Sequence, residues 1–265
     1  MNINTHTIWP DLQKIRQTVP LVHNITNYVV MNNTANALLA LGATPVMAHA
    51  IEEVEDMVKI SGALVINIGT LSEQWIEAMQ KAMLKAQELG KPIAFDPVGV
   101  GATSYRTATA QNLIKTVHPT VIRGNASEIS ALVGENSMTK GVDSTQKAEL
   151  AVDAAKELSK SYKCTVVISG KKDFIVKADQ VIEIENGHPL MAKVTGMGCT
   201  STALIGAFLA VNVEMTAAVH AMAVMGIAGE LAAEKAAGPG SLQMHFLDAL
   251  FNLKKADIEL RLKLS

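Results

Sequence analysis

The stretch ALVINIGTLSEQWIEAMQKAMLKAQELGKPIAFDPV, residues 63–98, decides the fold. It opens with an apolar run over 63–69, continues as a helical pattern over 72–90 and returns to an apolar run over 92–98. The helical pattern carries its charges on one face, and Gly90 suits its C-cap. The residues of this pattern that we expect to face a core are Trp75, Ile76, Met79, Met83 and Leu84. Two buried strands joined by one helix predict a parallel βαβ unit.

The same alternation continues on both sides of this unit. Further strand-like apolar runs lie at 20–26, 44–48, 119–125 and 165–170. Two short runs, 173–178 and 180–186, follow closely and indicate an antiparallel addition at the sheet edge. From Cys199 onward the pattern is helical, and a (β/α)8 barrel is disfavoured because its strands should continue to the chain end. We therefore expect an α/β fold with a mostly parallel central sheet, helices on both faces and a helical C-terminal third, as one domain over residues 1–265.

Composition narrows the classes of partner. The chain has 265 residues, about half of them apolar, and a formal net charge of −2 with no basic run, which argues against nucleic acid and membrane surfaces. The two cysteines, Cys164 and Cys199, form no disulfide framework, and the N-terminus is too polar for a signal peptide, so we expect a cytoplasmic protein. Polar residues interrupt the apolar segment 199–233 and break it near 211–216, which favours two buried helices over a membrane span.

Most residues that directly follow the predicted strands are polar or glycine. They are Asn24, Thr26, Asn27, Met47, Asn67, Gly69, Asp96, Pro97, Gly99, Arg123, Gly124, Asn125, Ser169 and Gly170. Any single one of these residues has an ordinary explanation, because polar residues and glycine commonly end strands. Because open α/β sheets bind ligands beyond the carboxyl ends of their strands, the whole set along one edge favours a polar cleft.

The motif TGMGC, residues 195–199, predicts an anion site. Gly196 and Gly198 allow backbone amides to turn inward at a helix N-terminus, where unpaired N–H groups and the helix dipole attract negative charge. The motif matches neither the GxGxxG dinucleotide fingerprint nor the phosphate-binding loop that ends in Gly-Lys-Ser/Thr. Alone it is a weak signal, since many helices begin with glycine and threonine.

Two further motifs carry the charged groups. In DPVGVGATSYR, residues 96–106, Asp96 ends a strand and is suited to hold Mg²⁺ beside phosphate oxygens, although a turn-capping role fits equally. In RGNASEI, residues 123–129, Arg123 and Glu128 suit phosphate and metal, or a structural ion pair. A metal, cationic donors and a dipolar anion site together are what phosphoryl transfer needs.

Cys199 lies in the first turn of the predicted anion-site helix. We expect this position to lower its thiol pKa, so that a thiolate takes or orients the proton of an attacking hydroxyl. A covalent nucleophile would need a histidine and carboxylate partner, which is not evident in the sequence. The remaining interpretation is a small residue that packs at a crowded helix start. Cys164 and His23, which lie in apolar runs, are expected to pack in the interior.

Five blocks, in this order, resemble hydroxyethylthiazole kinases of the ribokinase-like superfamily. They are residues 20–47, 62–71, 94–103, 121–129 and 194–208. The resemblance runs from about residue 20 to the C-terminus. It implies a ribokinase-like fold and ATP- and Mg²⁺-dependent phosphorylation of 4-methyl-5-(2-hydroxyethyl)thiazole in thiamine biosynthesis or salvage. It also implies a homotrimer with substrate sites between subunits.

The resemblance assigns roles position by position. Met47 and Gly196 would contact the thiazole, with Asn27 nearby. Arg123, Ser169 and Gly198 would bind ATP, and Asp96 and Glu128 would serve Mg²⁺. Gly196 and Gly198 would form the anion hole, with Cys199 facing the hydroxyl.

This chain departs from the usual pattern at two of the matched positions. Most of the superfamily has an aspartate general base where this chain has Cys199, and Met197 replaces a smaller residue between the two glycines. Two alternatives stay open: an ADP/ATP-dependent NAD(P)H-hydrate dehydratase of the same superfamily, for which the missing aspartate is unfavourable, and a non-catalytic thiazole or ATP sensor.

Overall fold

The computed structural model describes residues 4–134 and 144–265. Within them the strands form an eight-stranded sheet in the order β2-β1-β3-β4-β5-β6-β7-β8. The strands are β1 (Leu21–Ile25), β2 (Thr44–Val46), β3 (Ala63–Asn67), β4 (Ile93–Asp96), β5 (Val121–Asn125), β6 (Thr165–Ser169), β7 (Asp173–Lys177) and β8 (Gln180–Ile184). Strands β1 to β6 pair in parallel, whereas β7 pairs antiparallel with both β6 and β8. The predicted parallel sheet with an antiparallel edge is confirmed.

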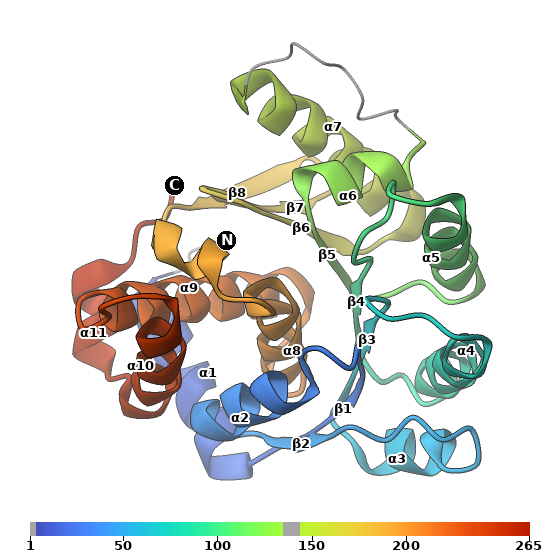
Figure 1. Cartoon of the computed structure of the whole chain (residues 1–265), viewed down its shortest axis with the longest axis horizontal. Coiled ribbons are helices and arrows are strands. Elements are labelled where there is room, and N and C mark those ends of the chain that lie inside the picture. The colour runs from blue at the N-terminus through green and yellow to red at the C-terminus, as the bar shows by residue number, and fades with distance from the viewer. Residues whose placement is uncertain (1–3, 135–143) are drawn as a thin grey trace.

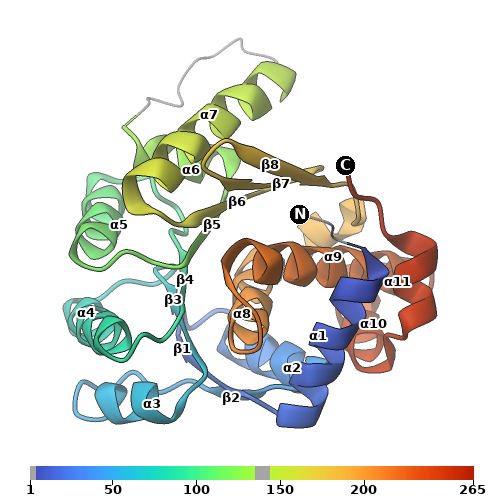
Figure 2. The same ribbon diagram turned by 180° about the vertical axis from the view of Figure 1, so that it is seen from behind.

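Helices cover both faces of this sheet. One face carries α3 (Val54–Ile60), α4 (Glu73–Glu88), α5 (Ser104–Thr116), α6 (Ala126–Leu132) and α7 (Ser144–Tyr162). The other carries α1 (Thr5–Thr18), α2 (Met31–Leu41), the 3₁₀ helix η1 (Pro189–Lys193), α8 (Met197–Leu209), α9 (Glu214–Ala233), α10 (Pro239–Asn252) and α11 (Lys255–Arg261). The sheet curves around α8, which lies on its concave side (Figures 1 and 2).

Burial on both faces explains the near-continuous apolar runs in the sequence. Along β3, Val65 points into the core shared with α8 and α9, whereas Leu64 and Ile66 point into the core beneath α3 to α7. The same alternation recurs in β4, where Ala94 and Phe95 face opposite cores. A strand with two covered faces has no solvent side to mark with polar residues.

Helix α8 packs tightly on the concave face of the sheet. Every residue from Thr200 to Leu209 is buried, and the helix contacts β1, β3 and β4. Gly206 permits the close approach, because a Cβ at that position would collide with Val65. Helix α8 thereby brings its first turn to the carboxyl ends of the strands.

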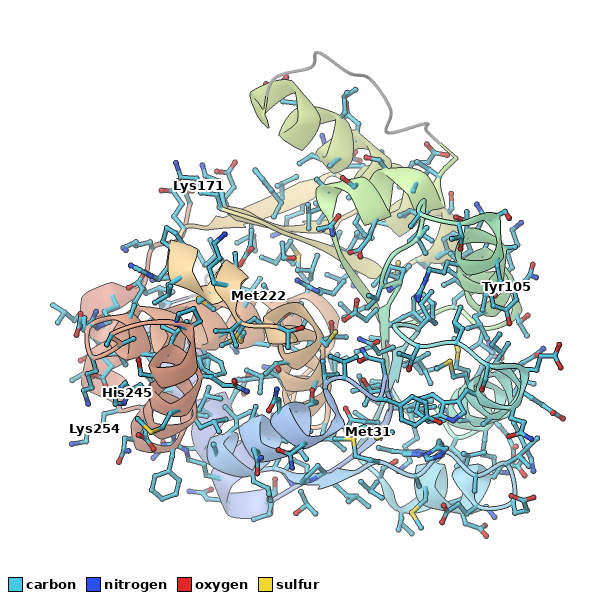
Figure 3. All side chains as sticks on the ribbon, in the orientation of Figure 1. Met31, Tyr105, Lys171, Met222, His245 and Lys254 are labelled. Carbon is cyan, nitrogen blue, oxygen red and sulfur yellow. The ribbon has the colours of Figure 1, made fainter. Side chains whose placement is uncertain are left out.

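The predicted break between two apolar helices is confirmed, because α8 ends at Leu209 and α9 begins at Glu214. Among the described residues, one segment, Met215–Ala233, is long and apolar enough to cross a membrane by length and composition, but 83% of its most apolar window is buried inside the fold. Side chains fill the space around α9, with Met222 in the interior and Lys171 and Lys254 at the periphery (Figure 3). Helix α9 therefore has the burial of a core helix.

Helix α4 corrects one prediction from its helical pattern. Trp75, Met79 and Met83 are buried as expected, but Leu84 is 45% exposed. The core face of α4 also contains small residues, Ala78, Ala82 and Ala86. Because Leu84 lies 100° around the helix from Met83, it falls outside this stripe. Gly90 follows the C-cap residue Leu89 and has the left-handed φ of +63° expected at a helix end.

Candidate functional site

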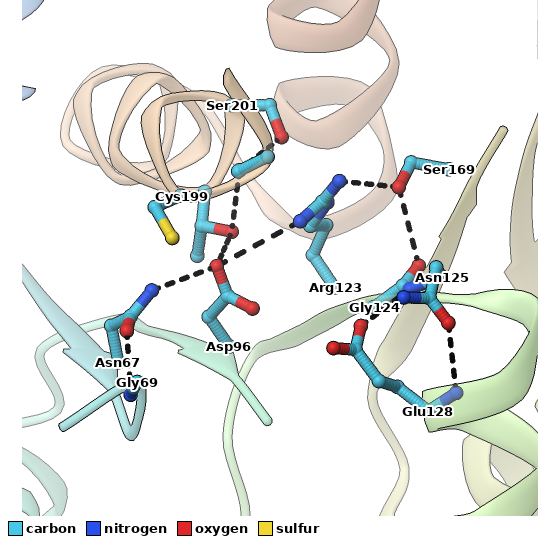
Figure 4. Close-up of polar contacts among 12 residues, drawn as sticks. Asn67, Gly69, Asp96, Arg123, Gly124, Asn125, Glu128, Ser169, Cys199 and Ser201 are labelled. Atoms are coloured by element: carbon cyan, nitrogen blue, oxygen red, sulfur yellow. Dashed lines mark hydrogen bonds and ion pairs between the residues drawn. The ribbon is translucent and has the colours of Figure 1, made fainter. Parts of the chain in front are cut away.

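Polar side chains meet at the carboxyl ends of β3, β4, β5 and β6, opposite the N-terminus of α8 (Figure 4). Asn27, which follows β1, joins them through Asn67. The parallel register places Asn67 of β3 beside Asp96 of β4. Asn67 Nδ2 donates to Asp96 Oδ2 at 3.0 Å, and Asn27 Nδ2 donates to Asn67 Oδ1 at 2.7 Å. The predicted cleft residues of three successive strand ends are therefore linked in one chain of hydrogen bonds.

Asp96 is the fully buried carboxylate of this group. Its Oδ2 accepts a hydrogen bond from Thr202 Oγ1 of α8 at 2.8 Å and lies 3.8 Å from Arg123 Nη1. Its Oδ1 has no hydrogen-bond partner among the described residues. Burial raises the pKa of Asp96 to about 6, and the nearby Arg123 partly opposes this shift. An unpaired buried oxygen is costly unless something else binds it, which is the situation expected of a ligand-holding group.

Arg123 joins the end of β5 to the first turn of α8. Its Nη2 donates to Ser169 Oγ, and Ser169 Oγ in turn lies 3.4 Å from the carbonyl oxygen of Gly124. The guanidinium packs directly on Gly198, where an added Cβ would lie 2.6 Å from Nη1. A glycine at 198 therefore lets a fixed positive charge lie against the helix start.

Glu128 has a structural role in which it binds backbone amides. Its Oε2 accepts from Asn125 N at 2.8 Å, and Asn125 Oδ1 accepts from Glu128 N at 3.0 Å, which is a capping box at the start of α6. Its Oε1 accepts from Gly99 N at 2.8 Å. The carboxylate thus ties the loop after β4 to the end of β5, and it is near enough to Asp96 to help raise the pKa of that group.

The N-terminus of α8 has the form expected of an anion site. Gly196 is the N-cap residue, with a left-handed φ of +85°, and no side chain caps the helix. The first i to i−4 bond runs from Thr200 N to the Gly196 carbonyl oxygen at 2.8 Å, so the preceding amides of the first turn lack helical partners. A Cβ at 196 would lie 2.7 Å from Val30 Cγ1, so side chains are excluded there by sterics as well as by backbone conformation.

Cys199 lies in this first turn, half-buried, with its Sγ 3.5 Å from Asn27 Nδ2. The prediction of a lowered thiol pKa is wrong. Burial raises the pKa of Cys199, and the carboxylate of Asp96 raises it further. The local effect of a helix start is outweighed by the surroundings that the fold supplies.

Met47 lies apart from the charged cluster. It is half-buried in the loop that follows β2, and none of the polar contacts described above includes it. Its carbonyl oxygen lies 3.3 Å from Nδ1 of His49. The structure therefore brings Asn27, Asn67, Asp96, Arg123 and Ser169 together at the first turn of α8 but leaves Met47 on a neighbouring loop. Asn24 lies apart as well, because its Nδ2 donates to the Val22 carbonyl oxygen of its own strand at 2.9 Å.

Two residues of the cluster escaped the sequence analysis. Thr202, which donates to Asp96, lies three positions beyond Cys199. Residues three apart share one face of a helix, so this spacing could have indicated that Thr202 faces the same site. Arg106 donates from Nη1 to the carbonyl oxygen of Ile68 at 2.7 Å and from Nη2 to that of Gly69 at 2.8 Å. A third bond, from Nη1 to Val98 O at 3.0 Å, makes Arg106 a clamp between the loops after β3 and β4.

Among residues 4–134 and 144–265, no group of three or more His, Cys, Asp or Glu side chains is placed to hold a metal by itself. The available donors are the free oxygen of Asp96 and the remaining lone pairs of Glu128, whose two oxygens already accept amide bonds. This set fits Mg²⁺, which binds through one or two carboxylates together with waters and substrate phosphates.

Comparison with known proteins agrees with this geometry. The Hydroxyethylthiazole kinase family profile matches residues 12–256. Hydroxyethylthiazole kinase of Syntrophus aciditrophicus (strain SB) is 60% identical over 266 residues, covering 100% of this chain and 98% of that protein. The structure of hydroxyethylthiazole kinase protein from Pyrococcus horikoshii OT3 has a TM-score of 0.91 at 43% identity and covers 98% of both chains.

A ribokinase-like superfamily protein from Enterococcus faecalis V583 has a TM-score of 0.65 at 14% identity, covering 97% of this chain and 90% of that chain, and shows the shared fold alone. The expected ribokinase-like fold is thus confirmed. The chain belongs to the hydroxyethylthiazole kinase family.

Proposed function

We propose that this protein transfers the terminal phosphoryl group of ATP to the hydroxyl of 4-methyl-5-(2-hydroxyethyl)thiazole, in thiamine biosynthesis or salvage. The acceptor oxygen forms a bond to the γ-phosphorus, the bond to the bridging oxygen breaks, and ADP and a proton leave. Family membership supports the reaction. The observation that carries it is the packing of the Arg123 guanidinium on Gly198, at a helix start whose amides have no side-chain cap.

The first turn of α8 and Arg123 together stabilise the migrating phosphoryl group. Gly196 turns the chain so that the amides of the first turn point away from the helix, and the dipole of α8 adds partial positive charge. Arg123 adds a full charge that Ser169 and Asp96 already hold in place. Donors fixed before the reaction need no reorganisation as charge develops, and this is the largest source of catalysis in such sites.

Asp96 is proposed to hold Mg²⁺ through its free Oδ1, and Glu128 to act through water because its oxygens are engaged with Gly99 and Asn125. When bound, Mg²⁺ neutralises charge on the β- and γ-phosphate oxygens. The hydrogen bonds from Asn67 and Thr202 hold the other oxygen of Asp96 and so fix the direction in which Oδ1 points.

Cys199 and Asn27 are proposed to orient the acceptor hydroxyl. A thiol whose pKa is raised stays protonated at neutral pH, so it acts as a hydrogen-bonding group and not as a strong base. A loose transition state makes little demand on a base, so this is compatible with turnover. We assign Met47 and Gly196 to the thiazole side, and Arg123, Ser169 and Gly198 to ATP.

We also propose that residues 1–265 form one domain, that the protein is cytoplasmic, and that it is a homotrimer with substrate sites at subunit interfaces. Val29, an exposed valine close to Asn27, is the kind of residue that such an interface covers. Light scattering of the purified protein tests the trimer.

The decisive experiment mixes the protein with the thiazole alcohol, ATP and Mg²⁺ and follows ADP release and phosphate-ester formation by ³¹P NMR. We expect stoichiometric ADP and thiazole monophosphate. Thermal stabilisation by the thiazole without product would favour a sensor, and turnover of hydrated NADH in a parallel assay would favour the dehydratase. Either result would replace the proposed function.

A further inference from the structure

Three aromatic side chains pack against one another, with tilted rings, beside the acceptor side of the proposed site. The ring of Trp75 lies 4.6 Å from that of Tyr28 and 4.5 Å from that of His49, centroid to centroid, with interplanar angles of 41° and 42°. Trp75, which contacts both other rings, is buried, whereas Tyr28 is 64% exposed. Each ring comes from the segment after a different strand, namely β1, β2 and β3. The three rings therefore connect the segments that follow β1, β2 and β3, beyond the last residues that pair in the sheet.

The loop 47–49 has few other supports. It follows β2, the three-residue strand at the sheet edge. The fully buried His23 of β1 donates from Nε2 to the carbonyl oxygen of Ala48 at 2.8 Å. Burial lowers the pKa of His23, so its ring is neutral. On the other side, His49 binds its own loop through the Met47 carbonyl and then stacks on Trp75.

Tyr28 makes the corresponding connection for the loop after β1. It directly follows Asn27, which contacts Asn67 and Cys199. Its backbone N–H donates to Thr70 Oγ1 at 3.2 Å, and its ring packs on Trp75. The loops that carry Asn27 and Met47 thus both contact the same indole, and Asn27 is held in addition by Asn67.

We infer that Tyr28, Trp75 and His49 form an acceptor clamp, a set of positioning residues that hold Asn27 and Met47 at the separation that the thiazole ring requires. This inference rests on the proposed function. The clamp acts on acceptor binding, because its three residues make none of the contacts to Asp96, Arg123 or Ser169 described above. Its link to the phosphate side runs through Asn27 and Asn67.

The test compares Tyr28→Ala with Tyr28→Phe, using purified full-length protein. Because an aromatic pair is worth a few-fold to about tenfold in an equilibrium constant, we expect Tyr28→Ala to raise the KM for the thiazole alcohol about 3- to 10-fold. The KM for ATP should stay within about twofold of wild type, and Tyr28→Phe should restore the thiazole KM, since it keeps the ring. Equal changes in both KM values, or no change in either, would overturn the inference.

The matched control is Tyr162→Ala. Tyr162 packs edge-to-face on His118, with centroids 5.2 Å apart, where α7 leads into β6 at the opposite end of the strands. We expect this variant, like Tyr28→Ala, to lose thermal stability, but without a change in the thiazole KM. A similar rise in the thiazole KM in both variants would show a general structural effect and overturn the clamp.

A binding measurement separates this inference from the proposed function. The chain has two tryptophans, so Trp9→Phe leaves Trp75 as the only indole. Titration with the thiazole alcohol in the absence of ATP should change its fluorescence, and Tyr28→Ala should weaken the apparent affinity about 3- to 10-fold. If wild type phosphorylates the thiazole but Tyr28→Ala binds it normally, the clamp fails and the kinase stands. If Tyr28→Ala alters the oligomeric state in light scattering, its ring is a subunit contact and the clamp also fails.

Discussion

The proposed site has two halves that are built in different ways. The phosphate half comprises Asp96, Arg123, Glu128, Ser169 and Gly198, and the acceptor half comprises Asn27, Tyr28, Met47, His49 and Trp75. Hydrogen bonds and an ion pair hold the phosphate half together: Arg123 contacts Ser169 and Asp96, and Glu128 accepts from the Gly99 amide. Stacked rings and single hydrogen bonds hold the acceptor half.

This difference follows from what each half must bind. A phosphoryl group carries charge that changes during transfer, so its donors must be oriented in advance in a water-poor environment. The thiazole alcohol is neutral, so shape and apolar contact suffice, and loosely supported loops are adequate. The phosphate half accordingly contains the buried charge, with the free-energy cost that burial entails, and the acceptor half contains the exposed ring of Tyr28.

The largest effect is expected from Asp96→Asn. The amide keeps a similar shape and can still accept from Asn67 and Thr202, but it removes the charge that faces Arg123. We expect kcat to fall about 10²- to 10³-fold, as when one preorganised electrostatic group is lost. Steady-state ADP release measures this. Retention of more than a tenth of the wild-type rate would remove Asp96 from the metal-holding role.

The same variant should be more stable than wild type. The folded-state pKa of Asp96, about 6, exceeds its ordinary value of 3.8, so its contribution to stability is complete below pH 3.8 and is lost as pH rises through about 6. At pH 7 the variant should therefore gain free energy of unfolding on the order of 2–3 kcal/mol. Urea denaturation at pH 4 and pH 7 measures this, and the gain should be much smaller at pH 4.

The matched control is Asp173→Asn. Burial raises the pKa of Asp173 to about 6 as well, and its Oδ1 accepts from Gly170 N at 2.9 Å. This variant should share part of the stabilisation at pH 7 but keep most of the kcat. An equal loss of kcat in both variants would mean that any buried carboxylate near Arg123 matters, and it would contradict the specific metal-holding role of Asp96.

The architecture was accessible from sequence because parallel strands with two covered faces leave continuous apolar runs. Every predicted strand, from 20–26 to 180–186, contains an observed strand, and the helical break near 211–216 is also observed. The exposure of Leu84 was not accessible, because a residue beside an apolar stripe faces core or solvent according to how the helix is rotated on its sheet.

The phosphate half was accessible for a related reason. Parallel strands end at one edge, so polar residues after apolar runs must gather there, and Asp96 and Arg123 do. The raised pKa of Cys199 was not accessible, because its causes are burial and the neighbouring Asp96, which come from other parts of the chain. The acceptor clamp was missed because its three rings lie in three separate segments and share no motif.

A second effect, smaller than that of Asp96→Asn, is expected from Gly198→Ala. The new Cβ would meet the Arg123 guanidinium, a flexible group that moves aside, so the protein should fold while Arg123 leaves its place beside Ser169. Misplacement of one fixed charge should lower kcat/KM for ATP about 10- to 100-fold. Gly240→Ala is the control, because Gly240 is likewise the second residue of a helix, α10, but has nothing within 4 Å of its Cβ position. Similar losses in both variants would indicate a general effect of glycine replacement at a helix start.

Cys199→Ala addresses the boundary between the halves. A thiol with a raised pKa supplies little thiolate at neutral pH, so the rate should fall by clearly less than the roughly 10²- to 10⁴-fold that a general base contributes. The pH–rate profile should keep its shape, because Asp96 and not the thiol sets the acid limb below about pH 6. Cys199→Asp should retain activity, since it supplies the carboxylate found in most of the superfamily. If wild type shows a rise in rate at alkaline pH, a roughly 10³-fold loss in Cys199→Ala together with the loss of that rise would instead assign proton removal to the thiolate.

The smallest effect is expected from His49→Phe, which separates stacking from hydrogen bonding within the acceptor half. Phenylalanine keeps a ring against Trp75 but loses the bond from Nδ1 to the Met47 carbonyl, which at 3.3 Å is already long. If the rings hold the loop, the KM for the thiazole should rise by no more than about twofold, near the lower end of what one hydrogen bond contributes. His49→Ala removes both contacts and should match Tyr28→Ala. A large change in His49→Phe, equal to that of His49→Ala, would show that the hydrogen bond and not the stack fixes Met47, and the acceptor half would then resemble the phosphate half in being held by directed polar contacts.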